Sequence, residues 1–341
     1  MSDIFNKLLI LRSPGIGPVK YAELIRKFNG NAQAVVDALV PEAVFRDSVM
    51  REMERAQALG IKYLADDDGR YPSALKKIKN HPPVICVRGN IDVLQKQMVA
   101  IVGTRHATAA GMKFVADLAE EFVKHNQVVV SGMAIGTDTA AHKGALRVGG
   151  DSQTVAVLAG GVDYIWPLEN ESLYWEIVER GAIISDMPVG FVPNAKNFVP
   201  RNRHVAGMAD RLIISEADLK SGSMTTARFA VEYGREVWAI PSHPSDSRAI
   251  GPNSLIRSGD AKLCFGVQDF FENEKMDNQK QKNSEKSESD FNLIDTLGTI
   301  PVSESVLAEI VKKTVSEIKT ELVVLELQGL VRKVDGGYVR V

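Results

Sequence analysis

The sequence predicts an α/β protein built on a doubly wound, mostly parallel Rossmann-like sheet. Two observations lead to this prediction: short runs rich in Val and Ile recur along the chain, and amphipathic segments lie between them. Continuous apolar strands are typical of a parallel sheet that is covered by helices on both faces. We expect strands at residues 98–103, 128–132, 154–161, 182–187, 211–217, 236–242 and 262–267.

The segments between these strands carry apolar residues at helical spacing. Phe114, Leu118 and Phe122 form one apolar stripe, and Leu173 and Ile177 form another. A stripe of this kind marks the face of a helix that packs against a core. These segments are therefore expected to cover the sheet.

The chain is long enough for more than one domain, and its composition divides it into four parts. With 341 residues, of which 45% are apolar and 25% charged, it resembles a globular protein with a sizeable core. We expect a helical domain at 1–60, a Rossmann-like domain with a leading connecting layer at 61–272, a linker at 273–290 and a winged-helix domain at 291–341. The connecting layer should contain one strand, within PPVICVRG.

Residues 1–60 are predicted to form a small helical domain of the SAM or helix-hairpin-helix type. Apolar residues at helical spacing flank the sequence PGIGP at 14–18. In a helix-hairpin-helix unit, such glycines let backbone N–H groups approach a DNA phosphate. The same sequence also suits a plain tight turn between two helices. Because Glu23 is close and the motif occurs once, we favour the plain turn.

The C-terminal part begins with a polar linker and ends in a predicted winged helix. The linker at 273–290 has Met276 as its one apolar residue, so it cannot bury enough surface to offset chain entropy. Two helical patterns follow, and then a hairpin that turns at 335–337. The second helix, near 316–328, carries three glutamates and one lysine. An acidic helix suits the DNA major groove poorly, so we expect a protein contact or a weak accessory role.

Several function classes are disfavoured by composition. Cys86 and Cys264 lie far apart in apolar runs, so we expect buried thiols, with neither a disulfide nor a metal site. No apolar run reaches 18 residues and the N-terminus lacks a cleavable signal pattern, which predicts a cytoplasmic protein without membrane contact. The net charge of −2 gives no general indication of a nucleic-acid partner, so that case depends on local patches.

The loops at the carboxyl ends of the strands are where a ligand is expected. The first of them, GTRHATAAG, begins at Gly103 and carries Arg105 where a dinucleotide-binding loop would have its second glycine. The strand at 128–132 offers no acid for a ribose. We therefore expect no dinucleotide, and the sequence indicates no other cofactor.

The second loop lies in SGMAIGTDTAAHKGAL, at 131–146. Gly132 and Gly136 allow tight turning of the backbone, and Thr137 or Asp138 is expected to cap the helix that follows. Asp138 and His142 have the i, i+4 spacing of half a metal site. Because no third ligand is evident, we expect a helix cap and a hydrogen-bonded histidine, and no metal.

Positive charge gathers near these loops although the whole chain is slightly acidic. Segment 187–209 contains no Asp or Glu, and segment 93–116 is also free of acids. Cations that hold phosphates, beside an aromatic ring on which a base stacks, are typical of single-strand binders. The alternative is a set of solvated faces around one core phenylalanine, and we favour binding slightly. The candidate contacts are Arg105, Lys143, Lys196, Phe198, Arg201 and Arg203.

A further loop, SGSMTTARFAVEYGR at 221–235, opens a helix whose N–H groups can bind an anion. It resembles the loop of the LOG group of nucleoside-monophosphate phosphoribohydrolases, which have a catalytic glutamate at the start of this helix. Here Thr226 stands in that region and the nearest acid is Glu232, more than a turn later. We therefore expect no catalytic residue and no enzyme activity, and the phosphoribohydrolase remains a disfavoured alternative. The residues expected to shape an anion-binding rim are Gly103, Gly132, Gly136, Asp138, Ser221, Gly222 and Ser223.

Six motifs occur in the order found in the DNA-processing protein A (DprA/Smf) family, which the chain resembles over residues 60–272 and in its flanking domains. The motifs are GTR (103–105), SGMAIGTDTAAH (131–142), LAGGVDYIWPLEN (158–170), RNRHVAG (201–207), SGSMTTA (221–227) and GREVWAIP (234–241). In that family the GxR arginine falls on Arg105. The basic loop before the RNR motif falls on Lys196 to Arg203, with Phe198 placed to stack on a base.

The resemblance implies the function of the chain. Members of the family bind single-stranded DNA, protect incoming strands during natural transformation and help to load the RecA recombinase onto DNA held by single-strand-binding protein. They act as homodimers formed through the Rossmann-like domain and need no catalytic activity. We expect the same partners for this protein.

Overall fold

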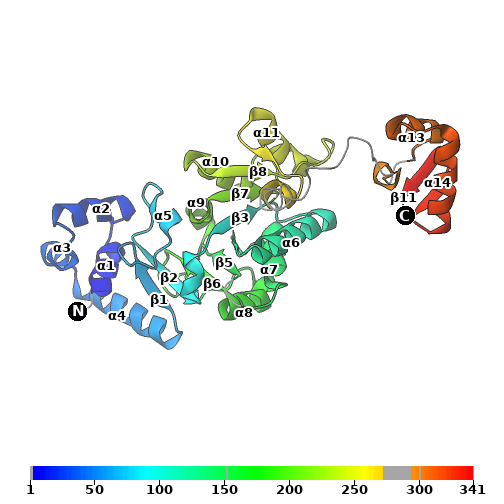
Figure 1. Ribbon diagram of the computed structural model, residues 1–341. Helices are drawn as coiled ribbons and strands as arrows, with labels where there is room; N and C mark the ends of the chain where they lie inside the picture. The colour runs from blue at the N-terminus through cyan, green and yellow to red at the C-terminus, as the bar shows by residue number, and fades with distance from the viewer. Residues whose placement is uncertain (1–2, 151–152, 272–292, 299–300, 341) are drawn as a thin grey trace, which may run out of the picture. The chain divides into compact units, whose positions relative to one another are not determined.

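The computed structural model describes residues 3–150, 153–271, 293–298 and 301–340. The chain divides into two compact units, Met1–Phe270 and Phe271–Val341. Figure 1 shows the elements of both, coloured from the N-terminus in blue to the C-terminus in red. The linker predicted at 273–290 lies outside the described residues.

The described residues of the first unit form one sheet of nine strands, which confirms the predicted fold class. The strands lie in the order β1-β2-β6-β5-β4-β3-β7-β8-β9. All pairs from β6 to β9 are parallel, while β2 pairs antiparallel with both β1 and β6. The bounds are β1 (Lys62–Ala65), β2 (Val84–Gly89), β3 (Met98–Val102), β4 (Val128–Ser131), β5 (Thr154–Val157), β6 (Ala182–Ser185), β7 (Arg211–Ile214), β8 (Glu236–Ala239) and β9 (Lys262–Leu263).

The structure differs from the predicted strands in two ways. The apolar runs extend beyond the strands, because buried residues such as Leu158 and Ala159 continue into loops after β5. The connecting layer contains two strands and not one. β1 was missed because it has four residues, and only Leu64 and Ala65 are buried. Its pairing with β2, from Lys62 opposite Val87 to Ala65 opposite Val84, is what makes it a strand.

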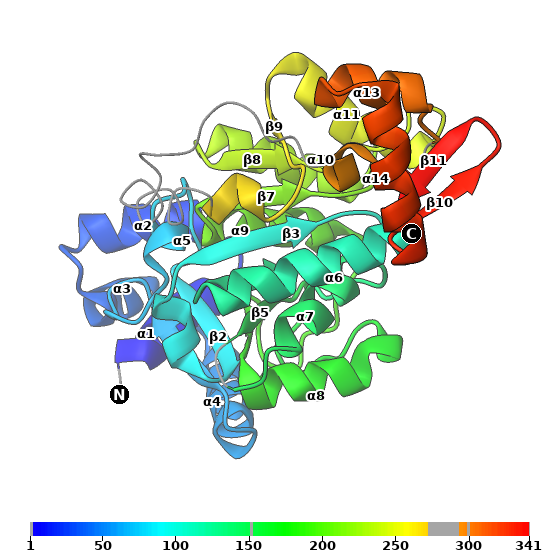
Figure 2. The same ribbon diagram turned by 45° about the vertical axis from the view of Figure 1, so that its right-hand side comes forward.

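Helices cover both faces of the sheet, as Figure 2 shows. Helices α6, α7 and α8 pack together on one face, and α9 and α10 pack together on the other. The bounds are α5 (Ser73–Lys76), α6 (Ala109–Lys124), α7 (Thr137–Leu146), α8 (Glu171–Arg180), α9 (Phe198–Met208), α10 (Gly222–Glu232) and α11 (Ile250–Ser258). The chain runs outward from β3 to β6 and then returns to β7 on the other side of β3. The strand order therefore reverses between β3 and β7, which is where ligands bind in sheets of this kind.

The N-terminal helical domain contains four helices, α1 (Asp3–Arg12), α2 (Pro18–Lys27), α3 (Ala32–Leu39) and α4 (Ala43–Ala58). The chain turns between α1 and α2 through Gly15, whose φ of +72° favours glycine. The apolar core of these helices includes Leu8 and Val35 and continues to Ala65 and Val84 of the sheet. The helical domain therefore shares a core with the edge of the sheet.

The second unit contains the helix–helix–ribbon pattern of the predicted winged helix. Its elements are α13 (Glu304–Val311), α14 (Val315–Leu327), β10 (Val331–Val334) and β11 (Gly337–Arg340). Thr314 and Glu317 form a reciprocal capping box at the start of α14. The two strands pair antiparallel from Val331 opposite Arg340 to Val334 opposite Gly337, so the turn lies at the predicted place.

Both cysteines are buried free thiols, as expected. Burial raises the pKa of the Cys86 and Cys264 thiols, so they stay protonated near neutral pH. In the part of the chain that the structure describes, the helices are too short or too polar to cross a bilayer.

Candidate nucleic-acid interface

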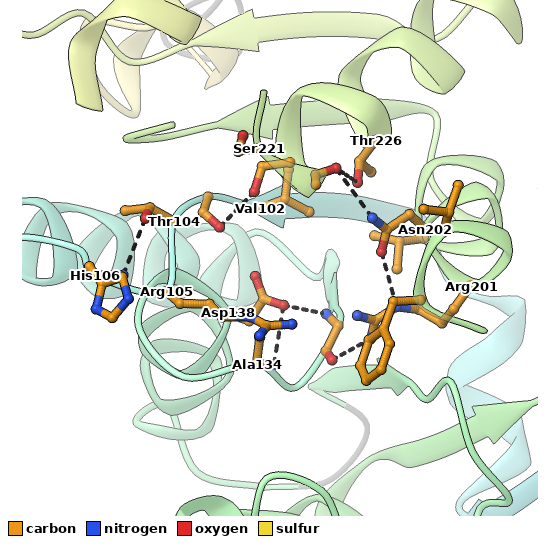
Figure 3. A pocket seen from close by; sticks show the side chains of 17 residues that line it. Val102, Thr104, Arg105, His106, Ala134, Asp138, Arg201, Asn202, Ser221 and Thr226 are labelled. Atoms are coloured by element: carbon orange, nitrogen blue, oxygen red, sulfur yellow. Dashed lines mark hydrogen bonds between the residues drawn. The ribbon is translucent and has the colours of Figure 1, made fainter. Parts of the chain in front are cut away.

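A cavity of about 310 Å³ lies at the carboxyl ends of β3, β4 and β7, at the reversal of the strand order. Its walls come from the loops after β3 and β4 and from the N-terminal parts of α7, α9 and α10. Figure 3 shows how side chains from these separate elements surround one space. The lining residues are Val102, Gly103, Thr104, Arg105, His106, Gly132, Ala134, Asp138, Phe198, Val199, Arg201, Asn202, Val205, Ser221, Gly222, Ser223 and Thr226.

Two aromatic rings and two guanidinium groups meet at one side of this cavity. The rings of Trp166 and Phe198 contact edge to face, with centroids 4.8 Å apart. The Arg105 Cζ lies 5.2 Å from the Trp166 centroid and 5.8 Å from the Phe198 centroid. The Arg201 Cζ lies 5.8 Å from the Phe198 centroid. Phe198 is thus placed between two cations, each at cation–π distance.

The exposed Arg105 side chain is available for a ligand. Within the described residues its guanidinium contacts the two rings and has no hydrogen-bonded partner. Burial lowers the pKa of Arg201, the charge of Asp138 opposes this shift, and the charge of Arg105 adds to it. An exposed guanidinium without a hydrogen-bonded partner is a group that can bind an anion.

The first turn of α10 closes another side of the cavity. Ser221 is the N-cap, and its side chain accepts a hydrogen bond from the Met224 N–H at 3.3 Å. The Ser223 hydroxyl donates to the Gly103 carbonyl oxygen at 2.6 Å, which joins the helix to the loop after β3. The N–H groups at the start of this 11-residue helix favour a negatively charged ligand.

The loop that carries Arg105 is fixed by the start of α7. The Thr137 N–H and hydroxyl both lie 3.2 Å from the Thr104 carbonyl oxygen. Gly136 has a φ of +81°, and a Cβ there would come within 2.5 Å of the same oxygen. Only glycine permits this approach of the two loops. Gly136 therefore serves the architecture of the site.

Arg201 and Asp138 form a buried charged layer at the floor of the cavity. Arg201 is 6% exposed, and its Nη1 donates to the carbonyl oxygens of Gly132 and Val157. Asp138 is 7% exposed and accepts the Gly132 and Ala134 N–H groups at 3.1 and 3.3 Å. Burial raises the pKa of Asp138 and lowers that of Arg201 to about 10, and each charge opposes the shift of the other.

The expected helix cap at α7 is wrong in detail. The N-cap of α7 is Gly136, without a side-chain cap, and Asp138 binds the N–H groups of the preceding turn. The reason is that the Gly132 and Ala134 N–H groups lie within hydrogen-bond distance of the Asp138 carboxylate, which binds them and not the N–H groups of its own helix.

His142 has no neighbouring ligand set for a metal. It is fully buried, and its Nδ1 lies 2.7 Å from the Thr154 hydroxyl oxygen, which itself donates to the Val129 carbonyl. Nδ1 is therefore the donor, and burial lowers the pKa of His142 to about 3, so the ring is neutral. The described residues contain no group of three metal-ligating side chains.

The structure brings most of the predicted residues to one cavity and leaves some outside it. Those that line it are Gly103, Arg105, Gly132, Asp138, Phe198, Arg201, Ser221, Gly222 and Ser223. Lys196 and Lys143 are exposed outside the lining, and Arg203 donates to the Tyr233 hydroxyl and the Lys79 carbonyl at 2.9 and 2.8 Å. DNA contact by any of these residues stays a prediction.

The segment expected as a basic loop is largely helical. From Phe198 onward it forms α9, with Pro200 tolerated in the first turn because the N–H it lacks would have no partner there. Residues two positions apart on a helix differ by about 200° in direction. Arg201 therefore points to the cavity floor while Arg203 points to α10.

Three residues of the site were not singled out from the sequence. Trp166 packs on Phe198, whereas His106 and Asn202 line the cavity. The Asn202 amide donates to the Gly222 carbonyl at 3.2 Å and accepts from Arg201 Nε at 3.1 Å. Trp166 follows a predicted strand, so its place in a strand-end loop was a usable signal.

The phosphoribohydrolase alternative requires a catalytic carboxylate at the start of α10, and the described residues place none there. Thr226 is buried in the second turn of α10, and its hydroxyl donates to the Gly222 carbonyl. Glu232 is exposed at the end of the same helix and outside the cavity lining. Asp138 is the one carboxylate among the described lining residues, and backbone N–H groups already occupy it.

Comparison with protein families gives matches along nearly the whole chain. The family described as DNA recombination-mediator protein A matches residues 62–275. A DprA-like N-terminal HHH domain matches residues 2–59, and a DprA winged helix domain matches residues 278–337.

Similar proteins and solved structures agree with these matches. Protein Smf of Synechocystis sp. is 38% identical over 211 residues, which cover 61% of this chain and 52% of that protein. The X-ray structure of DNA processing protein A (DprA) from Streptococcus pneumoniae has a TM-score of 0.69 and 30% identity, and covers 80% of this chain and 98% of that one. DNA processing protein A from Helicobacter pylori, described for a unique single-stranded DNA binding mode, has a TM-score of 0.58 and 32% identity, and covers 64% and 96%.

Proposed function

The chain belongs to the DNA recombination-mediator protein A family, and on this premise we propose that it binds single-stranded DNA as a recombination mediator. The observation that carries the proposal is the group of Arg105, Trp166 and Phe198 beside the cavity at the reversal of the strand order. A cation next to stacked aromatic rings serves both parts of a nucleotide, because the cation holds the phosphate and a ring holds the base. The H. pylori relative, described as a single-stranded DNA binder, supports the same ligand.

The arrangement suggests a division of roles among the residues. Arg105 and the N–H groups at the start of α10 would hold a phosphate, and Phe198 would stack on the adjacent base. Arg201 and Asp138 are too deeply buried to leave their backbone partners, so they would support the floor. The exposed Lys196 lies two residues before Phe198 and would extend the contact to a neighbouring phosphate.

The experiment that tests the proposal is a mobility-shift comparison of single-stranded and double-stranded DNA of equal length. The full chain should bind oligo-dT much more tightly than duplex, because the bases of a duplex are stacked inside it and cannot reach Phe198. The affinity should also fall steeply as salt rises, since phosphate contacts release counterions. Equal affinity for the two forms of DNA would contradict the proposal.

Replacing Phe198 with alanine is expected to weaken oligo-dT binding by about 1–3 kcal/mol, the usual contribution of one base–aromatic stack. Fluorescence anisotropy with labelled oligo-dT measures the change. Phe265→Ala is the matched control, because Phe265 is 73% exposed and lies outside the cavity lining. Equal losses in both variants would mean that Phe198 has no specific role.

We further propose the partners that the family resemblance implies. The protein would protect incoming strands in the cytoplasm during natural transformation and load the RecA recombinase onto DNA held by single-strand-binding protein, as a homodimer formed through the Rossmann-like domain. A strand-exchange assay on DNA coated with single-strand-binding protein tests the loading step, and no stimulation by the protein would refute it. Sedimentation of residues 1–270 would test the dimer.

A further inference from the structure

Glu216 is a buried carboxylate next to the loop that carries Arg105. It follows β7 and is 8% exposed. A buried carboxylate near a phosphate site is unfavourable unless hydrogen bonds satisfy it, and it would also repel the ligand. Its presence there therefore requires a structural explanation.

Hydrogen bonds of Glu216 hold both ends of the segment from Thr104 to Thr108. The Glu216 carbonyl oxygen accepts the Thr104 N–H at 2.6 Å. Its carboxylate accepts the Thr108 N–H at 2.7 Å through Oε2 and the Thr108 hydroxyl at 2.5 Å through Oε1. Arg105 lies between the two ends, so one residue fixes the chain on both sides of it.

The same carboxylate packs against the first turn of α6. Thr108 is the N-cap of this helix, and its hydroxyl oxygen accepts the Gly111 N–H at 2.9 Å. A Cβ on Gly111 would lie 2.7 Å from Glu216 Oε1, so a larger residue would displace the carboxylate. A negative charge is also favourable at the N-terminus of a helix. Glu216 is therefore held from several sides.

We propose that Glu216 is a positioning residue for DNA binding, which acts by holding the Arg105 loop in the shape that receives a phosphate. This inference rests on the proposed function. Glu216 is not among the residues that line the cavity. Its contribution is pre-organisation: a loop that is already ordered loses less conformational entropy when DNA binds.

The test is oligo-dT affinity, measured by fluorescence anisotropy, for three variants of the full chain. Glu216→Ala should weaken binding about tenfold, since it removes two hydrogen bonds to a charged acceptor. Glu216→Gln keeps the reach and one acceptor oxygen and should stay within about threefold of the parent. Glu216→Asp keeps the charge but loses reach, and should bind less tightly than Glu216→Gln. If affinity falls in the order Glu216→Gln, Glu216→Asp, Glu216→Ala, the length of the side chain matters more than its charge. The glutamine and aspartate variants keep the test valid if Glu216→Ala does not fold.

Glu236→Ala is the matched control for charge. Glu236 also binds two partners, Arg211 and Lys262, but it lies at the start of β8, at the amino ends of the parallel strands, whereas Glu216 and the cavity lie at their carboxyl ends. This variant should change oligo-dT affinity less than about twofold, which is the size of effect expected from a site that is independent of the binding site. Loss of a negative charge by itself should strengthen DNA binding. Weaker binding by Glu216→Ala would therefore result from the altered Arg105 loop and not from the change in charge.

A double-mutant cycle distinguishes positioning from general destabilisation. In an Arg105→Ala background, Glu216→Ala should have little further effect on binding, because the group it positions is gone. Full additivity of the two losses, or parent-like binding by Glu216→Ala, would overturn the inference. If binding depends on Arg105 but not on Glu216, only this inference fails. If the parent chain does not bind oligo-dT, the proposed function fails with it.

Discussion

Replacing Arg105 with glutamate is expected to lower the affinity for a short oligo-dT strand by about a hundredfold or more. A charge-assisted phosphate contact contributes about 1.5–3 kcal/mol, and the new carboxylate adds repulsion. The effect should be large because Arg105 is exposed and has no competing hydrogen-bonded partner among the described residues. Fluorescence anisotropy measures the affinity, and Arg105→Ala should reduce the slope of log affinity against log salt by about 0.7.

Arg257→Glu is the matched control for this reversal. Arg257 is exposed in the last turn of α11, shortly before the start of β9, and so lies near the amino ends of the parallel strands, whereas the cavity lies at their carboxyl ends. The two variants have the same net charge. If both weaken binding to the same extent, the effect reflects the overall charge, and the assignment of Arg105 is wrong.

Replacing Arg201 with methionine is expected to reduce the free energy of unfolding of the first unit by about 3–5 kcal/mol. The substitution removes the charge of Arg201 that favours the buried Asp138 carboxylate, and it also leaves the Gly132 and Val157 carbonyls without their donor. Urea unfolding followed by tryptophan fluorescence measures the loss. The three tryptophans, Trp166, Trp175 and Trp238, all lie in the first unit, so the signal reports that unit alone.

Two further variants test the explanation for this loss. Arg201→Met combined with Asp138→Asn should recover part of the stability, because an amide oxygen can still accept the Gly132 N–H without carrying a buried charge. Arg211→Met removes a partly exposed ion pair with Glu236 and should cost about 1 kcal/mol or less. If Arg201→Met alone lowers the free energy of unfolding by no more than Arg211→Met does, Arg201 is not important to the stability of the fold.

The sheet could be predicted because its signal is local. Each of the seven predicted strands lies in a run of apolar residues, and all seven are present, although β9 has only two residues and both are exposed. β1 could not be predicted in the same way, because KYLA is short and half exposed. Its identity as a strand depends on a partner, β2, that lies about 20 residues later in the chain.

The site was predictable in composition but not in geometry. Arg105 and Phe198 were found from loop position, charge and aromatic character, and the structure brings them within cation–π distance. The burial of Arg201 could not be seen, because it depends on carbonyl oxygens supplied by the loop after β4 and by β5. Glu216 escaped notice for a similar reason: its two hydrogen-bonded partners are more than 100 residues earlier in the sequence.

The shared core between the helical domain and the sheet edge determines where this protein can be divided. A cut near residue 60 would separate Leu8 and Val35 from Ala65 and Val84 and leave an apolar surface open to water on both fragments. It would also break the ion pairs Lys7–Asp67 and Arg55–Asp163. The division into two compact units falls after Phe270 instead. Residues 1–270 are therefore the piece in which the cavity should be studied, tagged or crystallised.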